Sequence, residues 1–466
     1  MTGTMSTLVF FAIILCIYYI LPLKFRWWLL LGASIVFYAS ADWKMLALLG
    51  ASIGISYFAG IKMFQSEEKQ QKKRWMFGTI ALLVVILMIF KYFGFFAGAV
   101  AAVMEGLGFG TNSLVFQIAM PLGISYYTFK IISYLVDIYK EKIDAEKHFG
   151  YYALYVTFFP QILCGPIERA DHFIPQLKYG CKFEDKLAAE GLERIIIGLF
   201  KKLAIADRLA LYVGTVFDAP TAYPGLASWM AAFFYAVQIY CDFSGYSDMA
   251  IGMAQMLGIR TRENFNYPYF SRSIKEFWSR WHMSLSGWLR DYIYIPLGGN
   301  RKGKLRKNIN TLAVFLVSGI WHGSSLSFVF WGGLHGLWNM ISRPKKAEDP
   351  VWKQILQVLI TFCGVTFTWI FFRAKDLATA VVMLKHMIFG FGLSIDQIIA
   401  SLLPFTGDNT CAAYFLIICL LILFQAVFEF RRTKGKGTSY GWLAAMLAMT
   451  LLLGQFGSSS FLYGQF

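Results

Sequence analysis

The chain has 466 residues, of which 57% are hydrophobic, 18% aromatic and only 15% charged. Hydropathy this high along the whole length excludes a set of soluble domains and predicts an all-α polytopic membrane protein. The net charge of +16 does not require a nucleic-acid partner. Lys and Arg that gather in loops set the orientation of membrane helices and face an anionic leaflet.

The N-terminal part alternates uncharged runs with basic clusters. Because no basic residue precedes the first run and no cleavage site follows it, we expect a retained helix rather than a signal peptide. Basic clusters at 24–26, 69–74 and 140–147 predict an N-terminus outside and these loops in the cytoplasm. This holds if 92–138 crosses once, although its Gly-rich start could dip in without crossing. The runs lie at 7–23, 27–41, 45–61, 75–90, 92–104 and 106–129.

The pattern is less regular over the next hundred residues. Residues 158–166 are short and broken by Pro and Gly, which favours a re-entrant segment. Residues 190–213 mix charges into an apolar background, which predicts an interfacial amphipathic helix. A span over 219–241 then runs into two carboxylates, Asp242 and Asp248.

The most basic stretch covers residues 260–307, with eleven Lys and Arg against three carboxylates. Within it, 276–291 predicts one amphipathic helix, since His282 shares a stripe with Trp278 and two leucines. The alternative to a functional role for this helix is that it only lies at the membrane interface, with its tryptophans at headgroup depth.

Between Lys307 and Arg343 no residue carries a formal charge, so this segment reads as membrane-embedded. It contains His322 and His335, and ionisable groups at such depth usually mark function. We expect a hairpin that breaks near Gly323, because the uncharged run 308–320 is shorter than a full crossing and Gly-Ser-Ser follows it. On one continuous helix the two histidines would point about 220° apart, so they pair only if the chain breaks there, or not at all. A histidine bonded to a backbone carbonyl remains the alternative for His322, and helix packing is favoured for His335.

Further apolar runs lie at 354–372, 409–428 and 437–466, which gives roughly eleven spans at about 20 residues each. We see no internal repeat and no soluble domain. The seven cysteines form no C-x-x-C pair, so neither a metal site nor a disulfide framework is indicated.

Four motifs together resemble the membrane-bound O-acyltransferase (MBOAT) superfamily. They are the segments 164–177, 242–248 and 277–301, and the Trp-His-Gly at 321–323. The similarity covers most of the chain after Pro121. It is closer to the bacterial branch of alginate O-acetyltransferase-like and teichoic-acid D-alanyl transfer proteins. The Trp-Gly-Gly-Leu-His-Gly ending at 336 and the 40-residue gap between His282 and His322 favour the alginate type.

The resemblance implies a single membrane domain over 1–466 in which helices and re-entrant pieces surround a central funnel or tunnel. Residues 1–120 would be N-terminal helices, 121–343 the catalytic core and 344–466 C-terminal helices. His322 would be the general base for a hydroxyl attacking an acyl thioester, with His282 as a second catalytic residue. His335 would support them from outside the substrate site. The substrate contacts would come from Trp321, Arg280, Asp242, Asp248 and Arg301.

The implied reaction moves an acetyl group from a cytoplasmic donor, acetyl-CoA or another acetyl thioester, for O-acetylation of an exported polysaccharide. No tightly bound cofactor, metal or nucleic acid is expected. The resemblance also implies an extracytoplasmic acetyltransferase partner and a location in the bacterial cytoplasmic membrane. Two alternatives stay open: D-alanyl transfer to teichoic acid, and a polysaccharide transporter without chemistry.

Overall fold

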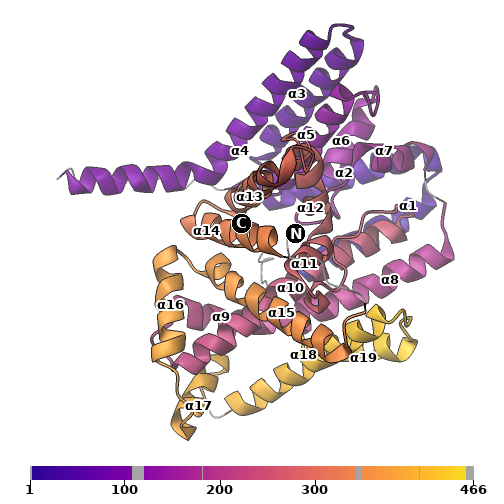
Figure 1. Cartoon of the computed structure of the whole chain (residues 1–466). Coiled ribbons are helices and arrows are strands. Elements are labelled where there is room, and N and C mark those ends of the chain that lie inside the picture. The colour runs from indigo at the N-terminus through magenta and orange to yellow at the C-terminus, as the bar shows by residue number, and fades with distance from the viewer. Residues whose placement is uncertain (1–2, 108–119, 181, 343–347, 409, 458–466) are drawn as a thin grey trace. The chain divides into compact units, whose positions relative to one another are not determined.

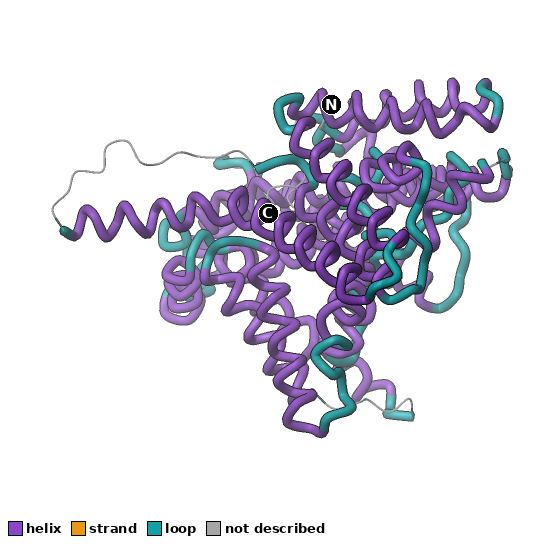
Figure 2. The backbone as a smooth tube through the Cα atoms, turned by 90° about the horizontal axis from the view of Figure 1, so that it is seen from above, coloured by secondary structure: helices purple, strands orange, loops and turns teal. Residues whose placement is uncertain are grey.

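The computed structural model describes residues 3–107, 120–180, 182–342, 348–408 and 410–457. Throughout these ranges the regular structure is helical, and Figures 1 and 2 show helices joined by loops with no strand. The all-α prediction is therefore confirmed. The basic flank Arg343, Lys345 and Lys346 and part of the run 106–129 lie outside the described residues.

Contacts divide the chain into two compact units, Met1–Gly191 with Met253–Arg262, and Leu192–Gly252 with Glu263–Phe466. The predicted division at 120 and 343 stays a prediction. The first unit holds α1 (Thr4–Ile20), α2 (Leu23–Asp42), α3 (Leu46–Gln65), α4 (Lys69–Gly106), α5 (Ile124–Tyr139), α6 (Phe149–Thr157), α7 (Ala170–Tyr179) and the start of α8 (Asp185–Leu199).

The second unit begins within α8 and contains a π-helix at Phe200–Ala206 and another at Arg290–Tyr294. Its α-helices are α9 (Asp207–Asp218), most of α10 (Gly225–Met256), α11 (Ile274–Arg280), α12 (Met283–Leu289), α13 (Gly303–His322), α14 (Leu326–Ile341), α15 (Val351–Arg373), α16 (Leu377–Phe389), α17 (Ile395–Leu402), α18 (Cys411–Thr433) and α19 (Tyr440–Leu453).

Four helices of the described chain are long and apolar enough to cross a membrane, judged by length and composition. They are α3, the segment Lys69–Gly98 of α4, α15 and α18. Shorter apolar helices include α1, α16 and α19. The apolar runs at 45–61, 75–90 and 354–372 are thus confirmed as helices, and the count of eleven spans stays a prediction.

The Pro- and Gly-broken segment after α6 is non-helical and buried, as the sequence predicts. Lys130 of α5 donates to the Tyr155 carbonyl at 3.1 Å and to Gln161 at 3.3 Å. The buried Glu168 accepts a hydrogen bond from His172, and this contact raises the pKa of His172 above its ordinary value. These contacts satisfy polar groups inside protein, which is the condition for irregular backbone at membrane depth.

The interpretation of residues 190–213 as an interfacial helix is wrong for its lysines. Lys201 and Lys202 are 5% and 1% exposed and lie on the π-helix that follows α8. Gly198 crosses α10 at Gly245, where a Cβ on Gly198 would stand 2.5 Å from the Gly245 carbonyl oxygen. The two glycines bring the backbones together, so the lysines point into the unit rather than toward headgroups.

Candidate active site

The uncharged segment after Lys307 forms a helical hairpin of α13 and α14, which confirms the predicted break. Gly323 ends α13, and a Cβ there would lie 2.2 Å from the Phe328 ring. Farther along the hairpin, a Cβ on Gly319 or Gly332 would meet backbone oxygen of the opposite helix at 2.3 or 2.4 Å. Small residues let the two helices pack backbone to backbone, as in membrane helix pairs.

His322 is the last residue of α13 and is 2% exposed. Its ring packs edge-on against Trp331 of α14, with centroids 5.2 Å apart, and against Phe372 of α15 at 5.1 Å. Three helices therefore fix the imidazole in an aromatic pocket that excludes bulk water. A general base held in this way can act only on a group brought next to it.

His335 lies on α14 and is fully buried, with both ring nitrogens engaged. The Trp278 indole N–H donates to Nδ1 at 3.3 Å, so Nδ1 carries no proton. Nε2 lies 2.9 Å from the Thr368 hydroxyl, which itself donates to the Val365 carbonyl at 2.7 Å. Nε2 therefore donates to Thr368, and the ring is a neutral bridge between α11, α14 and α15. These contacts agree with the packing interpretation of His335.

His282 is 1% exposed and its orientation depends on Asn264. The Ser284 backbone N–H points at the amide oxygen of Asn264 at 3.4 Å, and the Ser284 hydroxyl donates to it at 2.9 Å. His282 Nδ1 lies 2.9 Å from the same oxygen, so Nδ1 carries the proton. The amide nitrogen of Asn264 donates to Ser247 at 3.1 Å. The other ring nitrogen, Nε2, is thereby left as the basic one.

The single amphipathic helix predicted over 276–291 is wrong. The chain breaks at His282, whose φ of 43° is left-handed, and divides into α11 and α12. The Asn264 carbonyl accepts from the Met283 N–H at 2.9 Å in place of a helical bond. Trp281 and Trp288 are buried, so the alternative with tryptophans at headgroup depth also fails for them.

Trp321 connects the two histidines proposed to be catalytic. Its ring centroid lies 4.7 Å from that of His322 and 6.3 Å from that of His282. Trp331 in turn lies between His322 and His335, at 5.2 and 4.9 Å. All three histidines thus belong to one aromatic cluster of the second unit, and each is separated from the next by a tryptophan.

Asp242 and Asp248, expected to contact substrate, lie on α10 and take part in ion pairs. Asp242 lies 2.5 Å from Lys202, which also contacts Asp207 at 2.8 Å. Asp248 lies 2.9 Å from Lys201. Their role in substrate binding stays a prediction, while the described contacts are structural.

The two arginines expected to contact substrate are in polar or exposed surroundings, unlike the histidines of the aromatic cluster. Arg280 pairs with Glu276 at 2.6 Å within α11. Arg301 is exposed in the basic turn that precedes α13. Asn310 holds this turn by donating to the carbonyls of Leu297 and Gly299 at 3.3 and 2.9 Å. Their substrate roles likewise stay predictions.

Asn264 and Thr368 were not identified from the sequence, and Trp331 was noted only as the first residue of the Trp-Gly-Gly-Leu-His-Gly motif. Asn264 precedes His282 by 18 residues and belongs to a loop, so no periodicity links them. Thr368 lies within an apolar span, where its polar side chain is the one available signal. Within the described residues, no group of three or more His, Cys, Asp or Glu side chains could hold a metal ion.

Comparison with known proteins decides the family. The model of "MBOAT, membrane-bound O-acyltransferase family" matches residues 144–374. The chain is 38% identical over 385 residues to "Probable alginate O-acetylase AlgI" of Azotobacter vinelandii, covering 82% of this chain and 76% of that protein. The chain belongs to the membrane-bound O-acyltransferase family. As a member of this family it is a multi-pass membrane acyltransferase.

Two other relatives differ in how much of the chain they match. "Peptidoglycan O-acetyltransferase" of Helicobacter pylori is 37% identical over 404 residues, covering 80% of this chain and 76% of that protein. "Teichoic acid D-alanyltransferase" of Bacillus subtilis is 31% identical over 273 residues, covering 54% and 69%. The similarity to the two O-acetylating relatives therefore extends farther.

We expect replacement of His282 to abolish acyl transfer nearly as fully as replacement of His322, about 10²-fold or more. Because His282 has a positive φ, the informative variant is His282→Asn, which tolerates this backbone geometry and offers no imidazole. The measurement is the amount of acylated product formed per amount of folded protein. An Asn264→Ala variant, which removes the acceptor of Nδ1–H together with the side-chain contacts to Ser284 and Ser247 but keeps the imidazole, should lose less activity. Full activity in His282→Asn would exclude a catalytic role for this residue.

Proposed function

We propose that this protein is an O-acetyltransferase of the bacterial cytoplasmic membrane that supplies acetyl groups for an exported polysaccharide. The observation that carries the proposal is the extent of similarity to relatives named as O-acetylases, 37–38% over 80–82% of the chain. Both names describe acetylation of a glycan found outside the cytoplasm. A donor made in the cytoplasm and an acceptor outside it require transfer within or across the membrane.

In the proposed step, His322 removes the proton of an acceptor hydroxyl while its oxygen attacks the carbonyl of an acetyl thioester. The new C–O bond forms and the C–S bond breaks. The imidazolium then gives the proton to the leaving thiolate, which departs as a thiol. The surrounding rings of Trp321, Trp331 and Phe372 keep out water that would compete as acceptor. His282, with its proton held on Nδ1 by Asn264, offers a second basic nitrogen beside Trp321.

The donor is proposed to be acetyl-CoA or another acetyl thioester that arrives from the cytoplasm. An extracytoplasmic acetyltransferase is proposed to complete the transfer to the glycan. D-alanyl transfer is the second candidate, but the teichoic-acid relative shares only 54% of this chain. A transporter without chemistry is set aside because the chain belongs to an acyltransferase family.

The proposal is tested by acyl analysis of exported glycans from cells with and without the protein. Loss of O-acetyl groups with D-alanine esters unchanged is expected. Loss of D-alanine esters with O-acetylation intact would assign the second candidate instead. A carrier-protein requirement for activity would point the same way.

The basic turn before α13 allows a test of donor recruitment. Arg301, Lys302 and Lys304 are exposed at the start of a helix about 30 Å long that ends at His322. At that separation the cations can attract an anionic donor without touching the reacting carbonyl. Replacing all three with Gln should therefore raise the donor KM about ten-fold at low salt, with kcat unchanged.

A matched control removes three exposed cations of another basic cluster, Lys69, Lys73 and Arg74. The control should leave KM unchanged at every ionic strength. If the two triple variants behave alike, or if only insertion and yield suffer, the basic turn serves membrane orientation and not the donor.

A further inference from the structure

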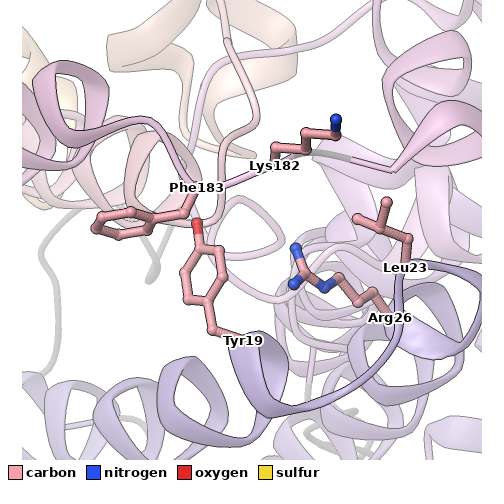
Figure 3. A pocket seen from close by; sticks show the side chains of 5 residues that line it. All are labelled: Tyr19, Leu23, Arg26, Lys182 and Phe183. Atoms are coloured by element: carbon pink, nitrogen blue, oxygen red, sulfur yellow. The ribbon is translucent and has the colours of Figure 1, made fainter.

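A second polar site lies in the first compact unit, at the turn between α1 and α2. Figure 3 shows five side chains around a cavity of about 540 Å³: Tyr19, Leu23, Arg26, Lys182 and Phe183. Two of the five are cations, and no carboxylate is among them. A cavity lined in this way suits an anion attached to an apolar group.

Arg26 forms a preorganised wall of this cavity. It is only 9% exposed, and its guanidinium lies over the rings of Tyr18 and Tyr19 at 4.6 and 4.9 Å. Its Nε donates to the Leu21 carbonyl at 3.1 Å. A planar guanidinium fixed by stacking loses little entropy when it binds phosphate oxygens. Its neighbour Lys24, by contrast, is exposed and does not line the cavity.

The aromatic floor is equally fixed. The Tyr19 hydroxyl donates to the Met256 carbonyl at 2.7 Å, and Phe183 packs edge-on against Tyr19 with centroids 4.9 Å apart. Glu184, the nearest carboxylate along the chain from Lys182, is contacted by Arg260 at 3.3 Å. Lys182 also lines the cavity and lies across it from Arg26 (Figure 3).

An exposed apolar stripe on α1 ends at this cavity. Its members recur every three or four residues, as on one face of a helix. They are exposed at 60%, 55%, 39% and 82% for Val9, Ile13, Ile17 and Ile20 respectively. Ile20 directly follows Tyr19, so the stripe leads along the helix to the two cations. In a membrane protein such a stripe faces acyl chains.

We propose that this cavity binds the phosphate of an anionic phospholipid, with Arg26 and Lys182 on the headgroup and the acyl chains along α1. Basic pockets between transmembrane helices on the cytoplasmic side bind anionic lipid headgroups. The predicted orientation puts the turn between α1 and α2 on that side. A soluble phosphate ester such as coenzyme A offers the same phosphate but leaves the stripe on α1 without a role.

The test uses delipidated full-length protein in detergent and titrates it with phosphatidylglycerol, phosphatidylcholine or coenzyme A. Bound lipid is counted by native mass spectrometry, and the shift in unfolding midpoint reports affinity. Phosphatidylglycerol is expected to bind and raise the midpoint, and the other two probes to have little effect. Lys182→Gln should weaken phosphatidylglycerol binding about five-fold, since one surface cation contributes about that factor.

Lys182 is exposed, so its replacement leaves the fold intact, whereas Arg26→Gln also removes packing on Tyr18 and Tyr19. Lys24→Gln is the matched control, since it removes an exposed charge at the start of α2, near Arg26, and should change affinity less than two-fold. Equal loss in Lys24→Gln and Lys182→Gln would overturn the site. Equal binding of phosphatidylcholine, or binding of coenzyme A alone, would overturn the lipid assignment.

Discussion

Replacing His322 is expected to reduce acetyl transfer by about 10²–10⁴-fold, the usual cost of removing a general base. The ring is 2% exposed and packs on Trp331 and Phe372, so His322→Ala also leaves a cavity and costs some stability. His322→Gln fills more of the space and cannot act as a base at neutral pH. Both variants should therefore be inactive, and His322→Gln should be closer to wild type in unfolding midpoint.

The matched comparison is His335→Ala. This change leaves the Trp278 N–H without its acceptor, removes the donor to the Thr368 hydroxyl oxygen and opens a cavity between three helices. We expect a loss of about 2–5 kcal/mol in stability and a lower yield. Glycan acetylation per amount of folded protein should stay close to that of the wild type.

The assay is O-acetyl content of the exported glycan, divided by the folded fraction measured on the purified variant. Full activity in both His322 variants, together with specific loss in His335→Ala, would move the catalytic role to α14. A parallel loss in all three variants would indicate that the aromatic cluster matters as a whole and that no single histidine is the base.

The hairpin at the site could be predicted because its signal is local. An uncharged segment, a Gly-Ser-Ser break and basic residues before α13 all lie within about forty residues of sequence. His322 is conspicuous because an ionisable residue stands in an apolar helix. Its partners on α14 and α15 follow from packing, which the sequence does not encode locally.

The break at His282 could not be predicted, because it depends on Asn264. The hydrophobic stripe through His282 has helical period, and nothing adjacent to it terminates a helix. The loop residue Asn264 supplies both a backbone carbonyl and an amide oxygen that replace helical hydrogen bonds. Such competition between a remote side chain and a local propensity is visible only in three dimensions.

The lysines of the π-helix were predicted to lie at the membrane surface, but they are buried. A charge in an apolar segment near a membrane is more often at the surface, and the sequence around Lys201 and Lys202 fits that interpretation. Their partners come from other helices, with Asp248 and Glu429 near Lys201 and Asp242 near Lys202. The close crossing of Gly198 and Gly245 makes these pairs possible.

Replacing Lys202 with Met should destabilise the protein by about 3–5 kcal/mol. Lys202 is 1% exposed and lies 2.5 Å from Asp242 and 2.8 Å from Asp207. Methionine keeps the length and apolar stem but removes the ammonium group that faces two buried carboxylates. Removing one member of a buried ion pair costs this much because the remaining charge is desolvated and uncompensated. Unfolding of the purified variant in detergent, followed by heat or denaturant, measures the effect.

The physical cause can be separated from simple loss of packing by neutralising the carboxylates as well. Adding Asp207→Asn and Asp242→Asn to Lys202→Met should recover much of the loss, since no unpaired charge then remains in the interior. Lys186→Met, at an exposed position on α8, is the surface control and should change stability by less than about 0.5 kcal/mol. If Lys202→Met behaves like Lys186→Met, the buried contacts are not ion pairs. If the triple variant is less stable than the single one, the lysine contributes through its packing rather than by neutralising Asp207 and Asp242.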